Sequence, residues 1–287
     1  MAQEISENYS EYKSKYDRYL RNIVNDIMRE NDNVKKALFV AVDLHTGQTR
    51  QGINNLPYIT HPIQVYDMVK RCIGNRKISD NDSDRDVLLS AALLHDGLED
   101  YKKADVKAGK LDHELAREQA IDVIKSKYTD KKFADKVVKL ILEITNPVQF
   151  TDEEGKEITK TEWQINHIPQ TSDQAKLLKI CDKTVNIVSD INEVPKDSTY
   201  ATEYKYIEKQ TSVVEAAMKG KNEISLKYVP SISTAYKIHN LAAESCKYIL
   251  QNMESCGKPF PPTKPVAFIH LSDITTQLFT RTNREYY

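Results

Sequence analysis

The stretch LLSAALLHDGLED, residues 88–100, places one imidazole and three carboxylates directly after a run of apolar residues. These polar side chains are those of His95, Asp96, Glu99 and Asp100. A helix advances 100° per residue, so all four would lie within about 140° of one another on one helix face. The folding of a core helix does not require such a group. Imidazoles and carboxylates on one face are typical of metal binding or of acid–base chemistry.

A second informative stretch is QAKLLKICDKTVNIVSDI, residues 174–191. Projected as a helix, it gathers Asp182, Lys179, Lys183 and Asn186 in a narrow polar strip, and apolar residues fill the remaining arc. A helix with so wide an apolar arc is expected to be mostly buried, so its polar strip must face either solvent or a cleft. A solvated helix face is the ordinary alternative. A strip with one acid among lysines and an amide could also provide a metal ligand next to the binding site of an anionic substrate.

A third stretch, GQTRQGINNLPYITHP at residues 47–62, places His61 immediately before a proline, where helical geometry is disfavoured. A single histidine at the start of a helix is more often a cap or a surface residue than a ligand. Together, however, neutral imidazoles and carboxylates form a mixed nitrogen and oxygen donor set. Such a set suits Mn²⁺, Fe²⁺ or Zn²⁺ and is too rich in nitrogen for Ca²⁺.

The charge composition is balanced, with 41 Lys and Arg against 42 Asp and Glu. The chain therefore has no overall field to attract nucleic acid or an anionic membrane. No stretch approaches the roughly 18 apolar residues of a membrane span, and the N-terminal sequence lacks the apolar region of a signal peptide. Four scattered cysteines without CxxC spacing indicate reduced thiols. We expect a cytoplasmic protein with no nucleic-acid or membrane partner.

Apolar residues recur at three- and four-residue spacing through most of the chain, and alternating strand patterns are scarce, which predicts an all-α fold. Helices are expected over residues 9–30, 34–45, 61–73, 86–100, 113–128, 131–145, 173–191, 200–220 and 232–254. A boundary is expected near residue 221. It separates a helical domain, residues 1–220, from a C-terminal helical extension, residues 221–287, that packs on the same body.

Taken in order, the three stretches resemble the HD-domain superfamily of metal-dependent phosphohydrolases. They are most similar to the hydrolase domain of the RelA–SpoT family and its stand-alone forms, the small alarmone hydrolases, which include the metazoan SpoT homologue. The matching segments are GQTR, PYITHP, AALLHDGLED and AKLLKICDKTVN. The second acidic pair in HDGLED marks the alarmone-hydrolase branch. The resemblance covers residues 30–220 and implies an HD-domain helical bundle.

The resemblance also implies a role for each matching residue. The implied metal ligands are His61, His95, Asp96 and Asp182. Mn²⁺ is the usual ion in this family, and other divalent transition metals would suit the same donors. Glu99 and Asp100 would position or deprotonate the attacking water. A metal ion with open coordination positions can both acidify water and polarise a phosphoryl oxygen.

An anionic substrate also needs cations and polar contacts from the protein. The residues assigned to substrate binding are Arg50, Lys179, Lys183, Asn186 and Tyr206. Arg50 matches the basic residue that contacts the nucleotide in relatives, and Asn186 matches an asparagine expected to face the ribose or base. Tyr206 is a looser match, since Tyr204 is almost as good a candidate.

Several positions depart from the family pattern. Gln51 stands where relatives carry a second basic residue, and Val188 replaces a frequent arginine. Gly97 interrupts the predicted catalytic helix at a cost of about 1 kcal/mol relative to alanine. Residues 74–86 and 146–173 lengthen the connections between motifs, and such insertions are often lids or specificity loops. They leave the chemistry intact but leave the identity of the nucleotide open.

The first hypothesis is hydrolysis of the guanosine alarmones ppGpp and pppGpp, which releases pyrophosphate from the 3′ position and returns GDP or GTP. A separate alarmone synthetase would then act in the same cell. An alternative keeps the metal and changes the substrate to NADPH or pyrophosphorylated adenosine. A further alternative is a non-catalytic HD module that binds a partner protein, but the presence of all six metal and acid positions favours catalysis.

Overall fold

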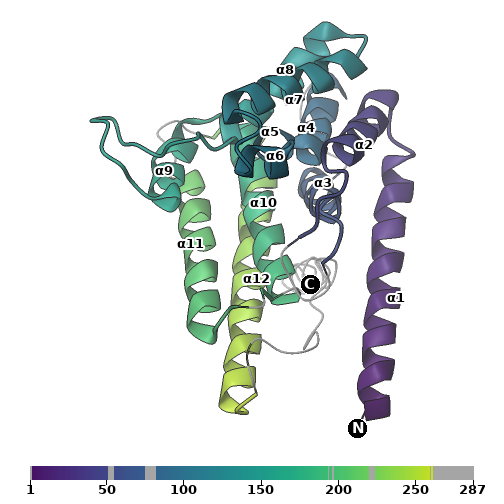
Figure 1. Cartoon of the computed structure of the whole chain (residues 1–287), viewed down its shortest axis with the longest axis vertical. Helices are drawn as coiled ribbons and strands as arrows, with labels where there is room; N and C mark the ends of the chain where they lie inside the picture. Colours follow the sequence, from purple (N-terminus) through teal and green to yellow (C-terminus); the bar gives the residue numbers. More distant parts are fainter. Residues whose placement is uncertain are drawn as a thin grey trace.

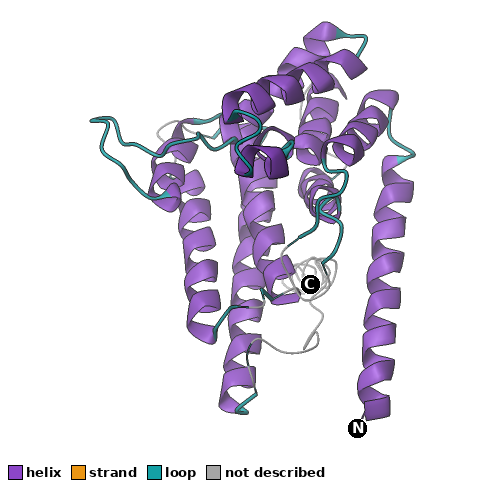
Figure 2. Cartoon of the chain, in the orientation of Figure 1, coloured by secondary structure: helices purple, strands orange, loops and turns teal. Residues whose placement is uncertain are grey.

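The computed structural model describes residues 2–50, 55–74, 82–192, 194–195, 197–219, 224–258 and 260. These residues form helices joined by turns (Figures 1 and 2). The helices are α1 (Ala2–Ile27), α2 (Asp32–Leu44), α3 (Thr60–Ile73), α4 (Asp82–Leu94), α5 (Gly97–Asp100), α6 (Lys103–Lys107), α7 (His113–Lys127), α8 (Lys131–Ile144), α9 (Lys160–His167), the 3-10 turn η1 (Ile168–Gln170), α10 (Asp173–Asn192), α11 (Tyr200–Met218) and α12 (Val229–Ser255). Extended backbone pairs only at two isolated bridges within these ranges. The prediction of an all-α fold is confirmed.

Short polar side chains begin several of these helices. The side chain of Asn31 accepts hydrogen bonds from two backbone N–H groups in the first turn of α2. Asp112 and Asp130 cap α7 and α8 in the same way, and Thr159 and Glu162 form a capping box at the start of α9. Each cap satisfies N–H groups that have no partner inside the helix. Local sequence therefore sets where these helices begin.

The prediction of one helix over residues 86–100 is wrong in one respect: α4 ends at Leu94, and α5 begins at Gly97. The turn between them has two physical causes. The His95 ring donates from Nδ1 to the carbonyl of Ala92, 2.9 Å away, and so occupies an acceptor at the end of α4. The backbone at Gly97 lies so close to α2 that a Cβ atom there would be 2.7 Å from Leu44 Cδ1. His95 and Asp96 therefore lie in a turn.

Helix α10 lies at the centre of the core. It packs against α12, α11, α3 and α8, and Figure 1 shows α10, α11 and α12 running side by side. Leu177, Leu178, Cys181 and Val185 on α10 have no exposed surface. Burial on several faces follows from the wide apolar arc of this helix. The prediction that α10 is mostly buried is confirmed.

Helix α12 covers one side of α10. Ile232, Ala235, Ile238 and Cys246 are fully buried, so this helix contributes to the same core. The structure describes residues 224–258 and 260 of the predicted C-terminal extension, and most of them lie in α12. Residues 221–223, 259 and 261–287 lie outside the described residues, so the predicted boundary near residue 221 does as well. The division into two units therefore stays a prediction.

The two predicted insertions differ in what can be described. Residues 75–81 of the first lie outside the described ranges. The second, residues 146–173, contains a short antiparallel turn closed by a bridge between Thr151 and Glu157, followed by α9 and η1. Helix α9 and η1 both pack against α11. The second insertion is therefore an ordered part of the body.

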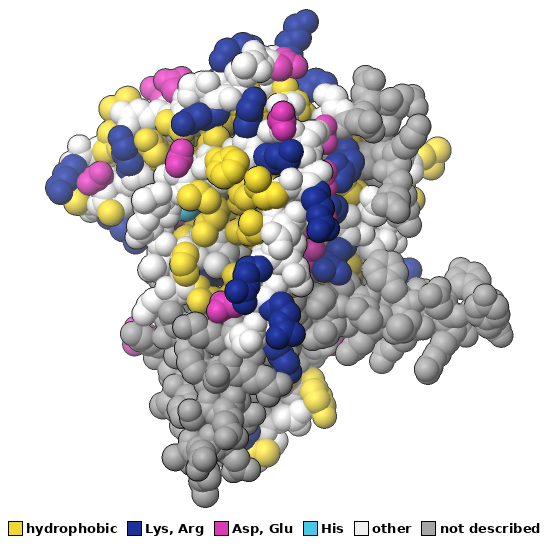
Figure 3. Space-filling view, turned by 90° about the vertical axis from the view of Figure 1, so that its right-hand side faces the viewer, with side chains coloured by type: hydrophobic (Ala, Val, Ile, Leu, Met, Phe, Trp, Pro, Cys, Tyr) yellow, Lys and Arg dark blue, Asp and Glu magenta, His cyan; other side chains and the backbone are white. Residues whose placement is uncertain are grey.

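The described surface is mixed in character. Figure 3 shows a group of hydrophobic side chains on the face at the right of Figure 1, with Lys and Arg side chains beside it. Phe39 and Val42 on α2 and Leu115 on α7 are among the exposed large hydrophobic residues. No described helix combines the length and the hydropathy that crossing a membrane requires.

Candidate functional site

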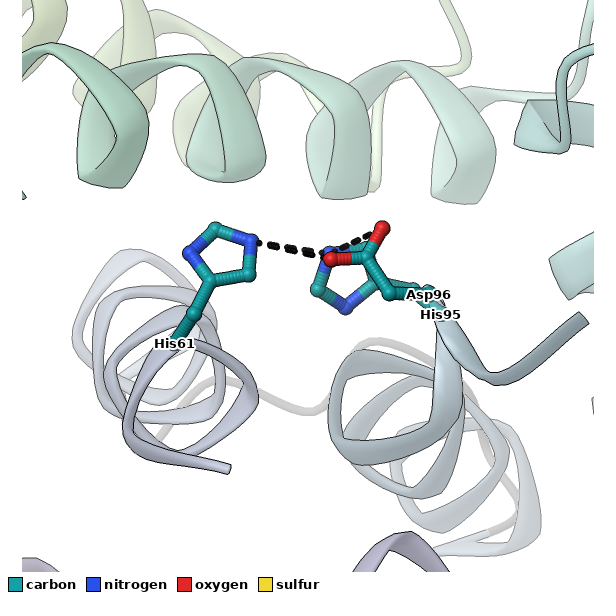
Figure 4. A group of neighbouring side chains, drawn as sticks. All are labelled: His61, His95 and Asp96. Carbon is teal, nitrogen blue, oxygen red and sulfur yellow. Dashed lines mark hydrogen bonds and ion pairs between the residues drawn. The ribbon is translucent and has the colours of Figure 1, made fainter. Parts of the chain in front are cut away.

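Three helices that pack on one another bring the predicted metal ligands together. His61 lies in the first turn of α3, His95 and Asp96 lie in the turn after α4, and Asp182 lies in the middle of α10. Figure 4 shows the His61 ring directed across the space between two helices toward Asp96 and His95. The structure therefore places these four residues, which are separated by up to 121 positions in sequence, side by side.

The donor atoms of this cluster lie within a few ångströms of one another. His61 Nε2 is 3.2 Å from His95 Nε2, 3.4 Å from Asp96 Oδ2 and 3.3 Å from Asp182 Oδ1. His95 Nε2 is 3.3 Å from Asp96 Oδ1 and 3.6 Å from Asp182 Oδ1. Only 1% of His61 and 3% of His95 is exposed. His61, His95 and Asp96 thus form a group that could hold a metal ion, and Asp182 Oδ1 lies within 3.6 Å of both imidazole Nε2 atoms.

Hydrogen bonds from outside the cluster orient its donors. A carbonyl can only accept, so the contact with Ala92 requires a proton on His95 Nδ1 and leaves the Nε2 lone pair of the neutral ring facing the cluster. The Tyr58 hydroxyl donates to Asp96 Oδ2 over 2.7 Å. The Asn186 amide donates to Asp182 Oδ1 over 2.7 Å. Once a metal ion displaces any proton from Nε2, the two imidazoles and the two oriented carboxylates fit a divalent transition metal, whose charge the carboxylates balance.

The pKa shifts in the cluster have opposite signs. Burial lowers the pKa of His61 to about 4. Burial also opposes protonation of His95, but the carboxylates of Asp96 and Asp182 outweigh it and raise the pKa of this ring to about 9. Burial alone would raise the pKa of Asp96, yet the two imidazoles hold it below its usual value. The two carboxylates therefore favour positive charge at His95, where a bound cation would take the place of the proton, whereas His61 stays neutral.

The predicted acid pair is divided between two surroundings. Glu99 accepts hydrogen bonds from the backbone N–H of Asn146 over 2.7 Å and from its side-chain amide over 2.8 Å. Asp100 Oδ1 lies 2.5 Å from Lys103 Nζ, and its backbone carbonyl accepts from Gln48 over 2.6 Å. Both acids lie on α5, one turn beyond the ligands, and not on a continuation of α4. The second insertion thus holds Glu99, and α6 neighbours Asp100.

Lys179 and Lys183 lie beside the cluster but are buried. Their Nζ atoms are 3.5 and 3.8 Å from Asp182 Oδ2, and Lys179 also donates to the carbonyl of Ile144. Burial would raise the pKa of Asp182, but the two lysines hold it well below its usual value. Burial and the charge of Lys179 lower the pKa of Lys183 to about 8. Both lysines thus lie close to the carboxylate of Asp182, and their predicted role in substrate binding stays a prediction.

A pocket of about 690 Å³ adjoins the cluster. Its walls include Arg50, Tyr58, Asp100, Asn186 and Tyr206, so three of the predicted substrate-binding residues share one cavity. The pocket lies next to the predicted metal ligands, since its lining residues Tyr58 and Asn186 hydrogen-bond to Asp96 and Asp182. The described residues that line it do not include Glu99, Lys179, Lys183 or Tyr204.

The loop between α2 and α3 positions the basic residue of this pocket. Arg50 donates its backbone N–H to Leu56 over 2.8 Å, and Tyr58 donates to Gln48 over 3.0 Å, which folds the loop back on itself. The Arg50 guanidinium carbon then lies 6.0 Å from the centre of the Tyr58 ring, within range of a cation–π contact. Arg50 is thus linked through Tyr58 to Asp96. Gln51, which replaces a second basic residue, lies outside the described residues.

Four charged residues on the pocket wall were not predicted. Lys103 and Lys107 come from α6, Asp190 from α10 and Glu203 from α11. The basic run YKKADVKAGK, directly after HDGLED, is the signal that could have indicated the two lysines. The two acids carry no comparable motif, since they are separated by a turn and meet only when α10 and α11 pack together.

An all-α fold that gathers two imidazoles and two carboxylates beside a charged pocket defines a helical protein with a candidate divalent-metal site. No family model matches the chain. The chain is 27% identical over 184 residues to guanosine-3′,5′-bis(diphosphate) 3′-pyrophosphohydrolase MESH1 of Mus musculus. The aligned region covers 64% of this chain and 83% of that relative. The corresponding Homo sapiens protein is 27% identical over 179 residues, 62% of this chain and 80% of that relative.

The predicted resemblance to the stand-alone alarmone hydrolases is thereby confirmed. A solved structure described as "A metazoan ortholog of SpoT hydrolyzes ppGpp and plays a role in starvation responses" matches with a TM-score of 0.47 at 22% identity, over 72% of this chain and 95% of that one.

Proposed function

We propose that this protein hydrolyses ppGpp and pppGpp to GDP or GTP and pyrophosphate, with Mn²⁺ or a related divalent ion held by His61, His95, Asp96 and Asp182. The observation that carries the proposal is the convergence of these four donors next to a pocket that contains Arg50, whose lining residues Tyr58 and Asn186 hydrogen-bond to Asp96 and Asp182. Similarity to relatives whose name states this reaction supports it. A separate alarmone synthetase would supply the substrate.

The reaction transfers the 3′-diphosphate to water. The water oxygen attacks the phosphorus attached to the 3′ oxygen, the bond between that phosphorus and the 3′ oxygen breaks, and the 3′ oxygen leaves as a hydroxyl after gaining a proton. A bound divalent ion would supply a more acidic water and would polarise the phosphoryl oxygen. The protein must then remove a proton, hold the nucleotide and offset its negative charge.

Asp100 is the better placed of the two acids to take the proton, because it lines the pocket that adjoins the ligands. Glu99 accepts three hydrogen bonds from Asn146. In this proposal it stabilises the turn of α5 that carries Asp100 and orients solvent at the edge of that turn. Arg50, linked through Tyr58 to Asp96, offsets phosphate charge next to the cluster. Asn186 both orients Asp182 and faces the pocket, where it would contact the ribose.

The test is product analysis by ion-exchange chromatography. Purified protein is incubated with Mn²⁺ and ppGpp, with NADPH and pyrophosphorylated adenosine in parallel, and Asp96→Asn is the matched inactive control. We expect GDP and pyrophosphate from the wild type alone. Turnover of NADPH or pyrophosphorylated adenosine without turnover of ppGpp would contradict the substrate but retain the metal chemistry. No turnover of any nucleotide by metal-loaded protein would overturn catalysis and favour a partner-binding module.

A further inference from the structure

The pocket contains two acids that the proposed reaction does not use. Asp190 and Glu203 line it together with Arg50, Lys103 and Lys107. Carboxylates repel phosphate groups, so their presence in a pocket for a highly anionic substrate requires a different ligand group. The lysines come from α6, which follows the catalytic turn, whereas the acids come from α10 and α11. The lysine side chains and these two acidic side chains of the pocket wall therefore come from different helices.

Glu203 is almost completely buried, with 3% of its surface exposed. Its Oε1 accepts a hydrogen bond from the Ser198 hydroxyl. Its Oε2 receives no hydrogen bond from any N–H or fixed hydroxyl among the described residues. A buried acceptor without a donor is costly, and such groups in folded proteins usually meet a ligand or share a proton.

Asp190 is the acidic neighbour of Glu203 on the pocket wall. Burial and the adjacent carboxyl of Glu203 raise the pKa of Asp190 to about 9, and Arg50 opposes this shift. Asp190 is only half-buried, so its side chain remains accessible at the pocket wall.

A pair of this kind accepts hydrogen bonds from N–H groups. When the 3′-diphosphate of a nucleotide lies at the metal ligands and Arg50, the group farthest from the reacting phosphorus is the base. Guanine presents a ring N–H beside an amino group, and these two donors can meet acceptor oxygens of the two acids. Adenine presents one amino group beside a ring nitrogen that only accepts, so it satisfies such a pair of acids less well.

We propose that Asp190 and Glu203 form the base-recognition subsite of this pocket and select a base with two adjacent N–H donors, as in guanine. This inference rests on the proposed function and specifies its substrate. It also accounts for acids in a pocket that otherwise serves phosphate groups. Tyr206, which lines the same pocket one turn after Glu203 on α11, supplies an aromatic surface beside the base.

The experiment compares kcat/KM for the 3′,5′-bis(diphosphates) of guanosine, inosine and adenosine. Inosine lacks the amino group and retains the ring N–H. We expect the wild type to prefer guanosine over inosine and inosine over adenosine. Glu203→Gln replaces one acceptor by a donor, so it should reduce kcat/KM for guanosine by roughly 10- to 100-fold, mainly through KM, and leave the adenosine substrate unchanged or improved. Asp190→Asn should likewise lower kcat/KM for the guanosine substrate relative to kcat/KM for the adenosine substrate.

Glu208→Gln is the control, because Glu208 is exposed on the same helix and does not line the pocket. Its selectivity should equal that of the wild type. An equal loss on all three substrates in Glu203→Gln would overturn the inference, since a sugar contact or a folding defect affects every base alike. If the wild type hydrolyses none of the three, the proposed function fails instead. Calorimetric titration with GDP, IDP and ADP then tests base selection separately, and equal affinities would overturn it.

Discussion

The metal cluster and the pocket beside it are built in different ways. The ligands of the cluster sit on or directly after long helices that pack on one another, and each of three ligands is fixed by a hydrogen bond from outside the cluster. The pocket shares α10 with the cluster through Asn186 and Asp190, but takes most of its walls from the loop after α2, from the short α5 and α6 and from the first turns of α11. Under the proposed function, the chemistry would depend on the packed core, whereas recognition would draw largely on segments outside it.

The largest effect is expected from Asp182→Asn. This change removes a ligand carboxylate and leaves Lys179 and Lys183 buried without their partner. We expect kcat to fall by more than about 100-fold, because changes outside the ligand set alone cost roughly 10- to 100-fold. Metal content by mass spectrometry and kcat should fall together. Asp135→Asn, exposed on α8, is the control. Full activity in Asp182→Asn would remove Asp182 from the site.

Arg50→Ala tests the pocket while leaving the cluster intact. Loss of the guanidinium should reduce kcat/KM by roughly 10- to 100-fold, mainly through KM, since a charged hydrogen bond contributes about 1.5–3 kcal/mol. Bound metal should remain at the wild-type level. Lys110→Ala, an exposed lysine beyond α6, should behave as the wild type. An unchanged KM in Arg50→Ala would show that the nucleotide lies elsewhere.

Asn146→Ala tests whether the second insertion supports the chemistry. Asn146 supplies three hydrogen bonds to Glu99, and Gln164 in turn donates to the Asn146 side chain over 2.7 Å. The variant keeps the backbone N–H and loses the amide, so we expect kcat to fall by about 10-fold through misplacement of Glu99. Metal content should not change. A loss of metal together with activity would instead indicate that the insertion stabilises the cluster itself.

The smallest effect concerns the turn that separates the ligands from the acid pair. Helix propensity alone predicts that Gly97→Ala stabilises the protein by about 1 kcal/mol. Because the added Cβ would meet Leu44 at 2.7 Å in a packed core, we expect a destabilisation of about 1–3 kcal/mol in urea unfolding. Leu44→Val in the same chain should offset part of this loss. A more stable Gly97→Ala variant would contradict the close approach.

The four residues of the cluster could be predicted from the sequence because helical periodicity and residue type can both be seen within each short stretch. Helical periodicity locates α3, α4 and α10, and the types of His61, His95, Asp96 and Asp182 indicate a cation site once those helices pack. Residue type could not reveal that α4 ends before His95 or that Gly97 then lies against the Leu44 side chain of α2. The helix projection likewise could not distinguish a lysine that neutralises Asp182 from one that contacts substrate.

The pocket was predicted only in part. Arg50, Asn186 and Tyr206 reach one cavity as expected, and their motif positions made this accessible to sequence reasoning. The meeting of Asp190 with Glu203 depends on how α10 and α11 pack and on the connection between them, which no periodic pattern specifies. Tertiary packing between non-adjacent segments is therefore what the sequence leaves open.

The most direct test of the account is a Mn²⁺ titration of protein stripped of metal, with free ion measured by electron paramagnetic resonance and ppGpp hydrolysis measured in the same samples. The account predicts that one ion binds per chain, that activity rises in proportion to it, and that Asp96→Asn neither binds the ion nor turns over ppGpp. Full hydrolysis of ppGpp by the metal-free wild type would contradict it, and so would Mn²⁺ binding by Asp96→Asn that is as tight as binding by the wild type.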